Sequence, residues 1–257
     1  MKELNNIKTA FKAEWLKTKG LGLMYFGIAI SLLLPLLNFI IHIFNERSRN
    51  YDGITKGIVH DYIEDSLTGF GGFFILLFII IVATRIAQTD HKNNGWTFME
   101  SQPLSKLSIY TAKFLSVATF SFITIALFFI FNIIFGLIDL AVFPRENYTY
   151  HIDFIKILQT FIRLFVLSLG IISVQIMLSV MISGFIWPFI IGFVGFVINI
   201  VGKVRQETYD FLVYNNLETG LAYKNPYELN QFFNYSEYLS IFWTIFFFVI
   251  GYLYYSK

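Results

Sequence analysis

Six apolar runs dominate this chain, and each is about long enough to cross a membrane as a helix. A helix rises 1.5 Å per residue, so about 20 apolar residues cover the roughly 30 Å of hydrocarbon in a bilayer. Because no water reaches the bilayer core, backbone polar groups there must be satisfied within a helix or a closed barrel. The predicted spans are residues 21–44, 69–88, 109–140, 154–182, 185–202 and 238–256. The predicted fold class is therefore an all-α membrane protein with six transmembrane helices.

Composition supports this class and excludes several functions. The chain has 56% hydrophobic and 14% charged residues, which exceeds the apolar content of ordinary soluble domains. Its net charge of +2 and its lack of any Lys/Arg-rich block argue against nucleic acid as a partner. The absence of cysteine excludes disulfides, Cys-ligated zinc, iron–sulfur clusters and thiol catalysis. We also predict no cleaved signal peptide, because residues 1–20 lack an apolar core followed by small residues.

Charge asymmetry predicts the topology. With both termini in the cytoplasm, the inner segments carry ten basic and four acidic residues, and the rest of the chain carries nine basic and thirteen acidic residues. This follows the positive-inside rule. Fusing the fourth and fifth runs would put the C-terminus outside, but the fused run of about 48 residues is too long for one span. We predict a multi-pass protein of the cytoplasmic membrane.

Residues 1–20 precede the first span and have an amphipathic pattern. On a helix, four apolar residues fall within about 80° of one another with three lysines beside them. These residues are Leu4, Ile7, Phe11 and Trp15, with Lys8, Lys12 and Lys19. The pattern predicts an interfacial helix, with Phe11 and Trp15 among lipid headgroups and Lys8 and Lys12 near lipid phosphates. The alternative is a basic flank that only sets topology.

Residues 89–108 form a polar segment between the second and third spans. Gly95 interrupts it, and the apolar residues Trp96, Phe98 and Met99 follow before Pro103 stops any helix. We predict a short amphipathic helix across the cytoplasmic face of the membrane.

The start of the third span is expected to be rigid. Ser105 can cap the helix, and Leu104 with Ile109 has the spacing of a hydrophobic staple. A push on the short helix would therefore move the third span.

Two stretches of the chain resemble the ABC-2 type permease family, the membrane subunits of ATP-binding-cassette exporters. One is Ala13-Glu14-Trp15-Leu16-Lys17, and the other runs from Asn94 to Lys106 with Tyr110 and Lys113 beyond it. Family members commonly show an acidic residue, a Gly-Thr pair, an apolar helix, Leu-Pro-x-Ser-Arg and a later lysine. Here Gly-Trp-Thr replaces Gly-Thr, Gln102 replaces the leucine and Lys106 replaces the arginine. The six-span layout matches along nearly the full length and looks most like the lantibiotic-immunity and peptide-export branch.

The resemblance implies one ABC-2 transmembrane domain over residues 1–257, with a coupling helix that docks on a separate ATPase. The implied coupling residues are Asn94, Gly95, Trp96, Thr97, Phe98, Met99, Glu100, Pro103 and Lys106. It also implies two ATPase copies, a second copy of this permease or a similar permease, and an outer gate formed by residues 203–237. The chain has no Gly-x-x-x-x-Gly-Lys-Ser/Thr loop, so the partner subunit would bind ATP and Mg²⁺, and no cofactor is expected in this chain.

Polar residues inside two predicted spans are candidates for a cargo path. Gln159, Thr160 and Arg163 share one face of the fourth span, and Asn132 and Asp139 share a face of the third. These side chains could line a cavity for a polar or anionic part of a cargo. Alternatively, Arg163 pairs with Asp139 or Asp153, and the third-span residues form interhelical hydrogen bonds.

No pattern indicates an enzyme. The chain lacks His-Glu-x-x-His and Gly-x-Ser-x-Gly, and its four histidines are scattered, so we predict no catalytic residues and no metal site. The expected function is a permease subunit that exports an amphipathic or hydrophobic cargo, such as a peptide, lantibiotic or drug, by alternating access. Sodium or lipid-linked cargo, and a homodimer or heterodimer, remain open. The alternative is a non-transporting membrane scaffold or sensor that docks an ATPase complex.

Overall fold

The computed structural model describes residues 2–45, 56–92, 103–143, 148–204, 213–214 and 233–256. Eight α-helices account for nearly all of them: α1 (Lys2–Thr18), α2 (Leu23–Asn45), α3 (Ile58–Gly69), α4 (Ile75–Lys92), α6 (Lys106–Val142), α7 (Phe154–Met181), α8 (Ile186–Val204) and α10 (Tyr235–Ser256). A π-helical turn, η1 (Phe70–Phe74), joins α3 to α4. Two short strands, β1 (Lys56–Gly57) and β2 (Tyr148–Thr149), pair in parallel.

Five helical stretches are long and apolar enough to cross a membrane. They are Leu23–Phe44, Ile58–His91, Lys106–Val142, Phe154–Met181 and Tyr235–Ser256. The prediction of an all-helical, multi-pass membrane protein is therefore confirmed. The fifth predicted span, residues 185–202, corresponds to α8, whose described apolar stretch Ile186–Ile198 is shorter than the other five.

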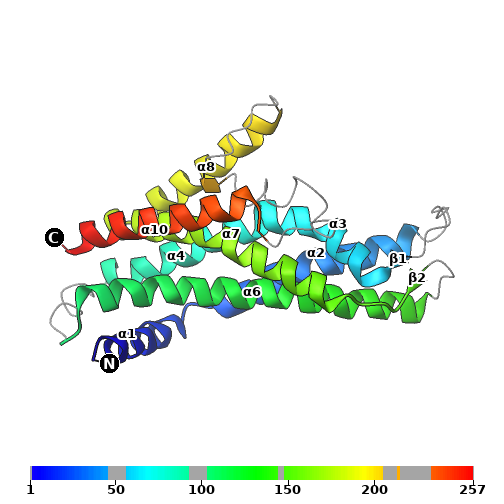
Figure 1. The fold of residues 1–257 in the computed structure, drawn as a ribbon, viewed down its shortest axis with the longest axis horizontal. Coiled ribbons are helices and arrows are strands. Elements are labelled where there is room, and N and C mark those ends of the chain that lie inside the picture. The colour runs from blue at the N-terminus through cyan, green and yellow to red at the C-terminus, as the bar shows by residue number, and fades with distance from the viewer. Residues whose placement is uncertain are drawn as a thin grey trace.

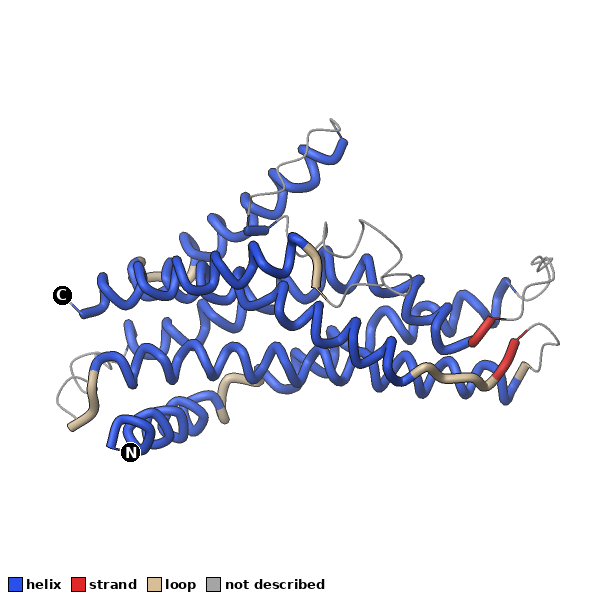
Figure 2. Tube along the Cα trace, viewed as in Figure 1, coloured by secondary structure: helices blue, strands red, loops and turns tan. Residues whose placement is uncertain are grey.

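The long helices run side by side, and both chain ends lie at the same end of the bundle (Figure 1). We call this the terminal end; it also holds α1, the end of α4 and the start of α6. The paired strands lie at the opposite end (Figure 2). In Figures 1 and 2, which share one orientation, α1 is foreshortened, whereas the spanning helices run along the length of the bundle. Helix α1 therefore crosses the bundle rather than extending it.

The helix that contains the second predicted span begins earlier than the sequence indicates. Residues 45–67 are polar enough to predict an outer loop, yet helix starts at Ile58 and continues through η1 into α4. Among the residues of α3, Val59, Tyr62 and Ile63 are fully buried. The acidic residues of α3 lower the hydropathy averaged along this segment, so the apolar stripe is not apparent from the sequence. Packing against α2 and α6 stabilises the extra turns.

Helix α6 lies at the centre of the bundle and packs against α1, α2, α3, α4 and α7. Small residues let neighbouring helices approach closely, as is common in membrane bundles. A side chain at Gly136 would meet the backbone of Val59 on α3 at 3.2 Å, and one at Gly170 on α7 would meet the hydroxyl of Ser240 on α10 at 2.9 Å. Helices α7 and α10 form the most extensive pair.

Candidate functional site

The segment expected to couple to an ATPase connects α4 to α6 at the terminal end. Asn94, Gly95, Trp96, Thr97, Phe98, Met99 and Glu100 lie outside the described residues, so their roles stay predictions. Pro103 and Lys106 are described and stand at the start of α6. The described surroundings of the coupling segment are therefore the two helix ends that flank it.

The start of α6 is capped as the sequence predicts. Ser105 is the N-cap residue, and its hydroxyl oxygen accepts a hydrogen bond from the Ser108 amide at 3.2 Å. Leu104 packs against the apolar core, in which Ile109 is fully buried. The Lys106 ammonium donates to the Ser256 carbonyl at 3.2 Å. A cation at the end of α10 also interacts favourably with the helix dipole there.

A cluster of four charged residues lies beside these helix ends. Its members are Glu14 and Lys17 on α1, Asp90 on α4 and Lys113 on α6. Lys113 Nζ lies 3.0 Å from Glu14 Oε1 and also contacts Asp90 Oδ2. Lys17 Nζ lies 3.0 Å from Glu14 Oε1 and 2.8 Å from Asp90 Oδ1. We call this arrangement the charge ring, because each lysine contacts both carboxylates.

The charge ring is buried although it is made of ions. Glu14, Asp90 and Lys113 are at most 2% exposed, and the Lys17 side chain is 31% exposed. Isolated charges are costly in such surroundings, so buried ions are paired. Two positive and two negative charges balance here, which makes the burial tolerable.

Local sequence patterns place the α1 members of the ring. Ala10, Glu14 and Thr18 are spaced four residues apart and form the buried face of α1. Trp15 adds an aromatic contact, since its ring stacks on Phe120 of α6 with centroids 4.9 Å apart. Family resemblance pointed to Glu14 and Lys113, but their mutual contact was not predicted. Two charges of each sign next to apolar spans are the signal that could have suggested it.

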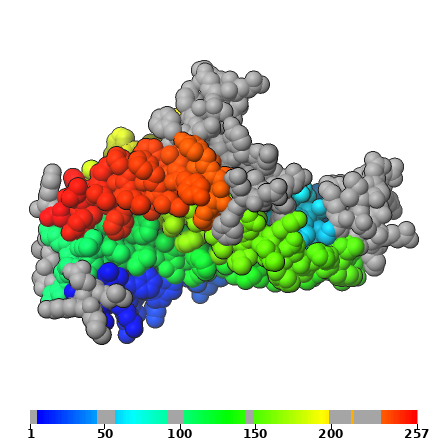
Figure 3. All heavy atoms as spheres, in the orientation of Figure 1, coloured from blue at the N-terminus to red at the C-terminus, as the bar shows by residue number. Residues whose placement is uncertain are grey.

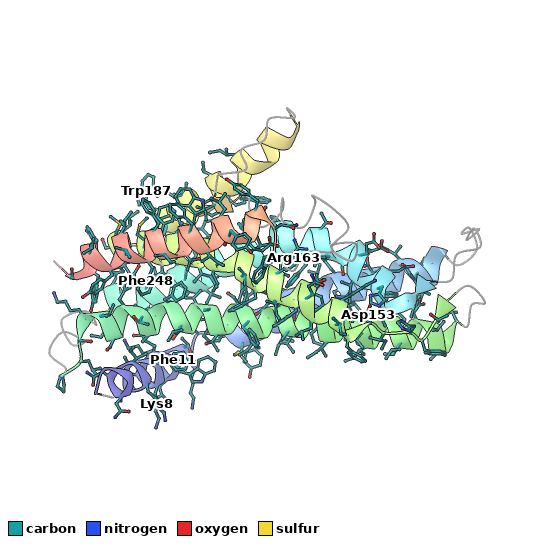
Figure 4. All side chains as sticks on the ribbon, in the orientation of Figure 1. Lys8, Phe11, Asp153, Arg163, Trp187 and Phe248 are labelled. Atoms are coloured by element: carbon teal, nitrogen blue, oxygen red, sulfur yellow. The ribbon has the colours of Figure 1, made fainter. Side chains whose placement is uncertain are left out.

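The predicted membrane-surface residues divide between two faces of α1. Lys8 and Lys12 are exposed, and Lys8 points away from the bundle (Figure 4). Phe11 stacks on Trp15 with centroids 6.1 Å apart. Figure 3 shows α1 (blue) on the surface at the terminal end, against α6 (green). Part of the predicted lipid-facing stripe is therefore covered by protein, because the Trp15 ring packs on Phe120.

Arg163 lies deep between helices and is ion-paired (Figure 4). Its Nε lies 2.6 Å from Oε1 of Glu237 on α10, and both residues are at most 2% exposed. The backbone N–H of Asn234 donates a hydrogen bond to the other carboxylate oxygen of Glu237 at 2.8 Å. Glu237 is a partner that the sequence analysis did not name for Arg163. The pair joins α7 to α10.

The other cargo-path candidates also make contacts within the bundle. Asn132 on α6 accepts from the Ser66 hydroxyl on α3 at 2.8 Å, and Asp139 Oδ2 lies 3.2 Å from His42 Nδ1 on α2. The Thr160 hydroxyl donates to the Lys156 carbonyl of its own helix at 2.9 Å. These contacts fit the interhelical alternative for Asn132 and Asp139, and the half-buried Gln159 is the most accessible of the α7 candidates. A cargo role for any of them stays a prediction.

Gln175 on α7 forms a polar node that the sequence analysis missed. Its Nε2 donates to the Pro188 carbonyl of α8 at 2.8 Å, and its Oε1 accepts from the Tyr214 hydroxyl at 3.2 Å. A side chain at Gly195 of α8 would meet the Tyr214 ring at 2.6 Å. The node ties α8, which leans away from the bundle in Figure 1, to α7.

Within the described part of the chain, no group of three or more His, Asp or Glu side chains is arranged to hold a metal ion. Most of the polar contacts described above are hydrogen bonds and ion pairs between helices, and they connect α1, α2, α3, α4, α6, α7, α8 and α10.

Comparison with known proteins identifies the family. Residues 10–199 match the family described as ABC-2 family transporter protein. No curated protein and no solved structure matches the chain significantly. The family match extends from the third turn of α1 into α8, and therefore includes the charge ring and the segment between α4 and α6. Proteins of this family are membrane components of transporters rather than catalytic enzymes, and they normally work with an ABC ATPase. This chain belongs to the ABC-2 transporter permease family.

Proposed function

We propose that this protein is the permease subunit of an ATP-driven exporter and that a separate ABC ATPase docks on residues 94–100. The family match over residues 10–199 carries the proposal. The position of the flanking helices supports it, because α4 ends at Lys92 and α6 begins at Lys106 at the same end of the bundle. A force applied between these two ends would act on two spanning helices together.

In this proposal, Trp96, Phe98 and Met99 pack into a groove of the ATPase, and Glu100 faces a basic residue there. The capped start of α6 stiffens this connection, since Ser105 caps the first turn and Leu104 packs against the apolar core. ATP and Mg²⁺ bind to the partner subunit, and this chain needs no cofactor of its own. Two ATPase copies would act on this permease and on a second copy or a similar permease.

We also propose six crossings with both termini in the cytoplasm, and the resemblance to the lantibiotic-immunity and peptide-export branch favours a bacterial cell. The end of α7 is close to the end of α4, where Ser179 O lies 3.0 Å from His91 Nε2, and α10 ends beside Lys106. Because α10 runs toward the terminal end, the chain between the end of α7 and the start of α10 must leave this end. Helix α8 supplies the outward path, and its 19 residues are roughly 28 Å long. The excess of lysine at this end favours the cytoplasm.

The proposed cargo is amphipathic or hydrophobic, such as a peptide, a lantibiotic or a drug, and it leaves the cytoplasm or the membrane by alternating access. The half-buried polar side chain of Gln159 in a predominantly apolar span supports a path with occasional polar contacts. The predicted outer gate, residues 203–237, lies mostly outside the described residues. A scaffold or sensor that binds an ATPase without moving cargo is the alternative.

Purification of the tagged protein under mild conditions tests the proposal. We expect a P-loop ATPase to co-purify with the permease in equal amounts, and we expect the eluate to hydrolyse ATP. Replacing both Trp96 and Glu100 by alanine should abolish co-purification, whereas Glu64→Ala, a change at an exposed residue of α3, should not. Failure to recover an ATPase with the intact oligomer would overturn the assignment. Transport of a labelled peptide into vesicles separates an exporter from a scaffold.

A further inference from the structure

The charge ring connects three helices at the point where an ATPase would act. We propose that the ring of Glu14, Lys17, Asp90 and Lys113 is an ionic joint that forces α1 to move with the ends of α4 and α6. The surface helix α1 is then part of the path by which ATPase motion reaches the membrane. This inference rests on the proposed function, because it assigns a route to the motion that the ATPase supplies.

Two members of the charge ring lie close to the coupling segment. Asp90 lies two residues before the end of α4, and Lys113 lies seven residues after the start of α6. Seven residues of helix correspond to about 10 Å, so both side chains attach close to the coupling segment. Whichever of the two helices is displaced, the displacement reaches the same group of charges.

The contacts of the charge ring form a closed loop. Glu14 contacts Lys17 and Lys113, and Asp90 contacts the same two lysines. If α1 moved away from α4 and α6, Glu14 would lose Lys113, and Asp90 would lose Lys17. Separating buried partners leaves charges without compensation, which is far less favourable than moving the three helices together. The ring therefore resists separation more strongly than a single surface ion pair would.

Helix α1 is connected to both α6 and α4. Stacking of Trp15 on Phe120 attaches α1 to α6, but this contact does not reach α4. The Lys17–Asp90 ion pair, at 2.8 Å, ties α1 to α4 directly. Lys17 is also the most exposed member of the ring, with a side chain that is 31% exposed.

A charge-neutral double variant tests the joint without leaving an unbalanced charge. Glu14→Gln with Lys17→Gln removes both α1 charges and leaves the Asp90–Lys113 pair in place. Glu64→Gln with Lys19→Gln is the matched control, because it removes the same two charges from exposed positions. Hydrogen exchange on the purified permease alone is the first readout. We expect α1 amides to exchange on the order of tenfold faster in the ring variant and at the wild-type rate in the control.

The second readout follows α1 during ATP turnover. The chain has no cysteine, so Leu16→Cys on the exposed side of α1 provides a single site for an environment-sensitive fluorophore. In the permease–ATPase complex we expect ATP with vanadate to change the emission of the wild-type and control proteins. The ring variant should still bind the ATPase and should lose most of this change, together with peptide transport.

The outcomes separate the inference from the proposed function. If ATP with vanadate changed the emission of the ring variant as much as that of the wild type, the proposed joint would be overturned. This would hold even if the α1 amides exchanged faster, because the ring would then have a purely stabilising role. Exchange at the wild-type rate in the ring variant would overturn it as well. If no ATPase co-purifies with the wild-type chain, the proposed function fails, and the coupling role of the joint fails with it.

Discussion

Arg163 on α7 and Glu237 on α10 form an ion pair that is almost completely buried, with 2.6 Å between Arg163 Nε and Glu237 Oε1. The two residues lie 74 positions apart in the chain, and their helices form the most extensive pair in the bundle. Removing one partner of such a pair leaves a buried charge without its counter-ion, whereas replacing both by apolar residues is often tolerated.

The first prediction follows from this asymmetry. Glu237→Leu should lower the free energy of unfolding by about 3 kcal/mol, because it removes the carboxylate that faces Arg163. The double variant Arg163→Met with Glu237→Leu should recover most of the loss. Thermal unfolding in detergent measures both effects, with Glu64→Leu as the exposed control. If the double variant is stable and still transports cargo, Arg163 has a structural role. If it is stable but does not transport, Arg163 contributes to the cargo path. We expect transport to persist.

Close contact between α7 and α10 gives a second prediction. A methyl group at Gly170 would lie 2.9 Å from Ser240 Oγ and 3.3 Å from the Ser240 carbonyl oxygen. Gly170→Ala should therefore push the helices apart and cost about 1–3 kcal/mol of stability. Gly184→Ala is the matched control, because a methyl group there meets nothing within 4 Å. Equal melting temperatures for the two variants would contradict the close packing of these helices.

The Gln175 node gives a third prediction. Gln175→Leu keeps a similar side-chain size but removes the hydrogen bonds to Pro188 and Tyr214, at a cost of about 1–3 kcal/mol. Because the node ties α8 to α7, hydrogen exchange should rise selectively in α8. Gln159→Leu makes the same chemical change at a half-buried position of the same helix and should leave α8 exchange unaltered. Protection of α8 in the Gln175 variant would show that apolar contacts alone hold it.

A fourth prediction concerns the coupling segment. If Glu100 faces a basic residue of the ATPase, Glu100→Arg places two like charges together and should reduce cargo-stimulated ATP hydrolysis severalfold. The purified permease should keep its melting temperature, since the change affects the interface between subunits. Glu64→Arg serves as the control, because it makes the same charge reversal on the exposed surface of α3. Full stimulation in the Glu100 variant would count against this residue as a coupling contact.

Much of the helical layout could be read from the sequence, because a long apolar run is a local property. The cap at Ser105 was predictable for the same reason, since capping involves groups only three residues apart. The early start of the second span was not predictable. Val59 and Ile63 are covered by other helices, but the acidic residues of the same segment, such as Asp61 and Glu64, make it look like a loop when the sequence is read by itself.

The sequence by itself determined that this protein is a helical membrane protein, because hydropathy over about 20 residues is enough to decide whether a helix enters lipid. Tertiary structure alone decided which polar groups meet. Glu14 and Lys113 are 99 residues apart, and Gln175 and Tyr214 are 39 residues apart. Many carboxylates and amides could have satisfied each partner. Helix packing selected among them, because buried charges and hydrogen-bonding groups must find partners within a few ångströms, wherever in the chain those partners come from.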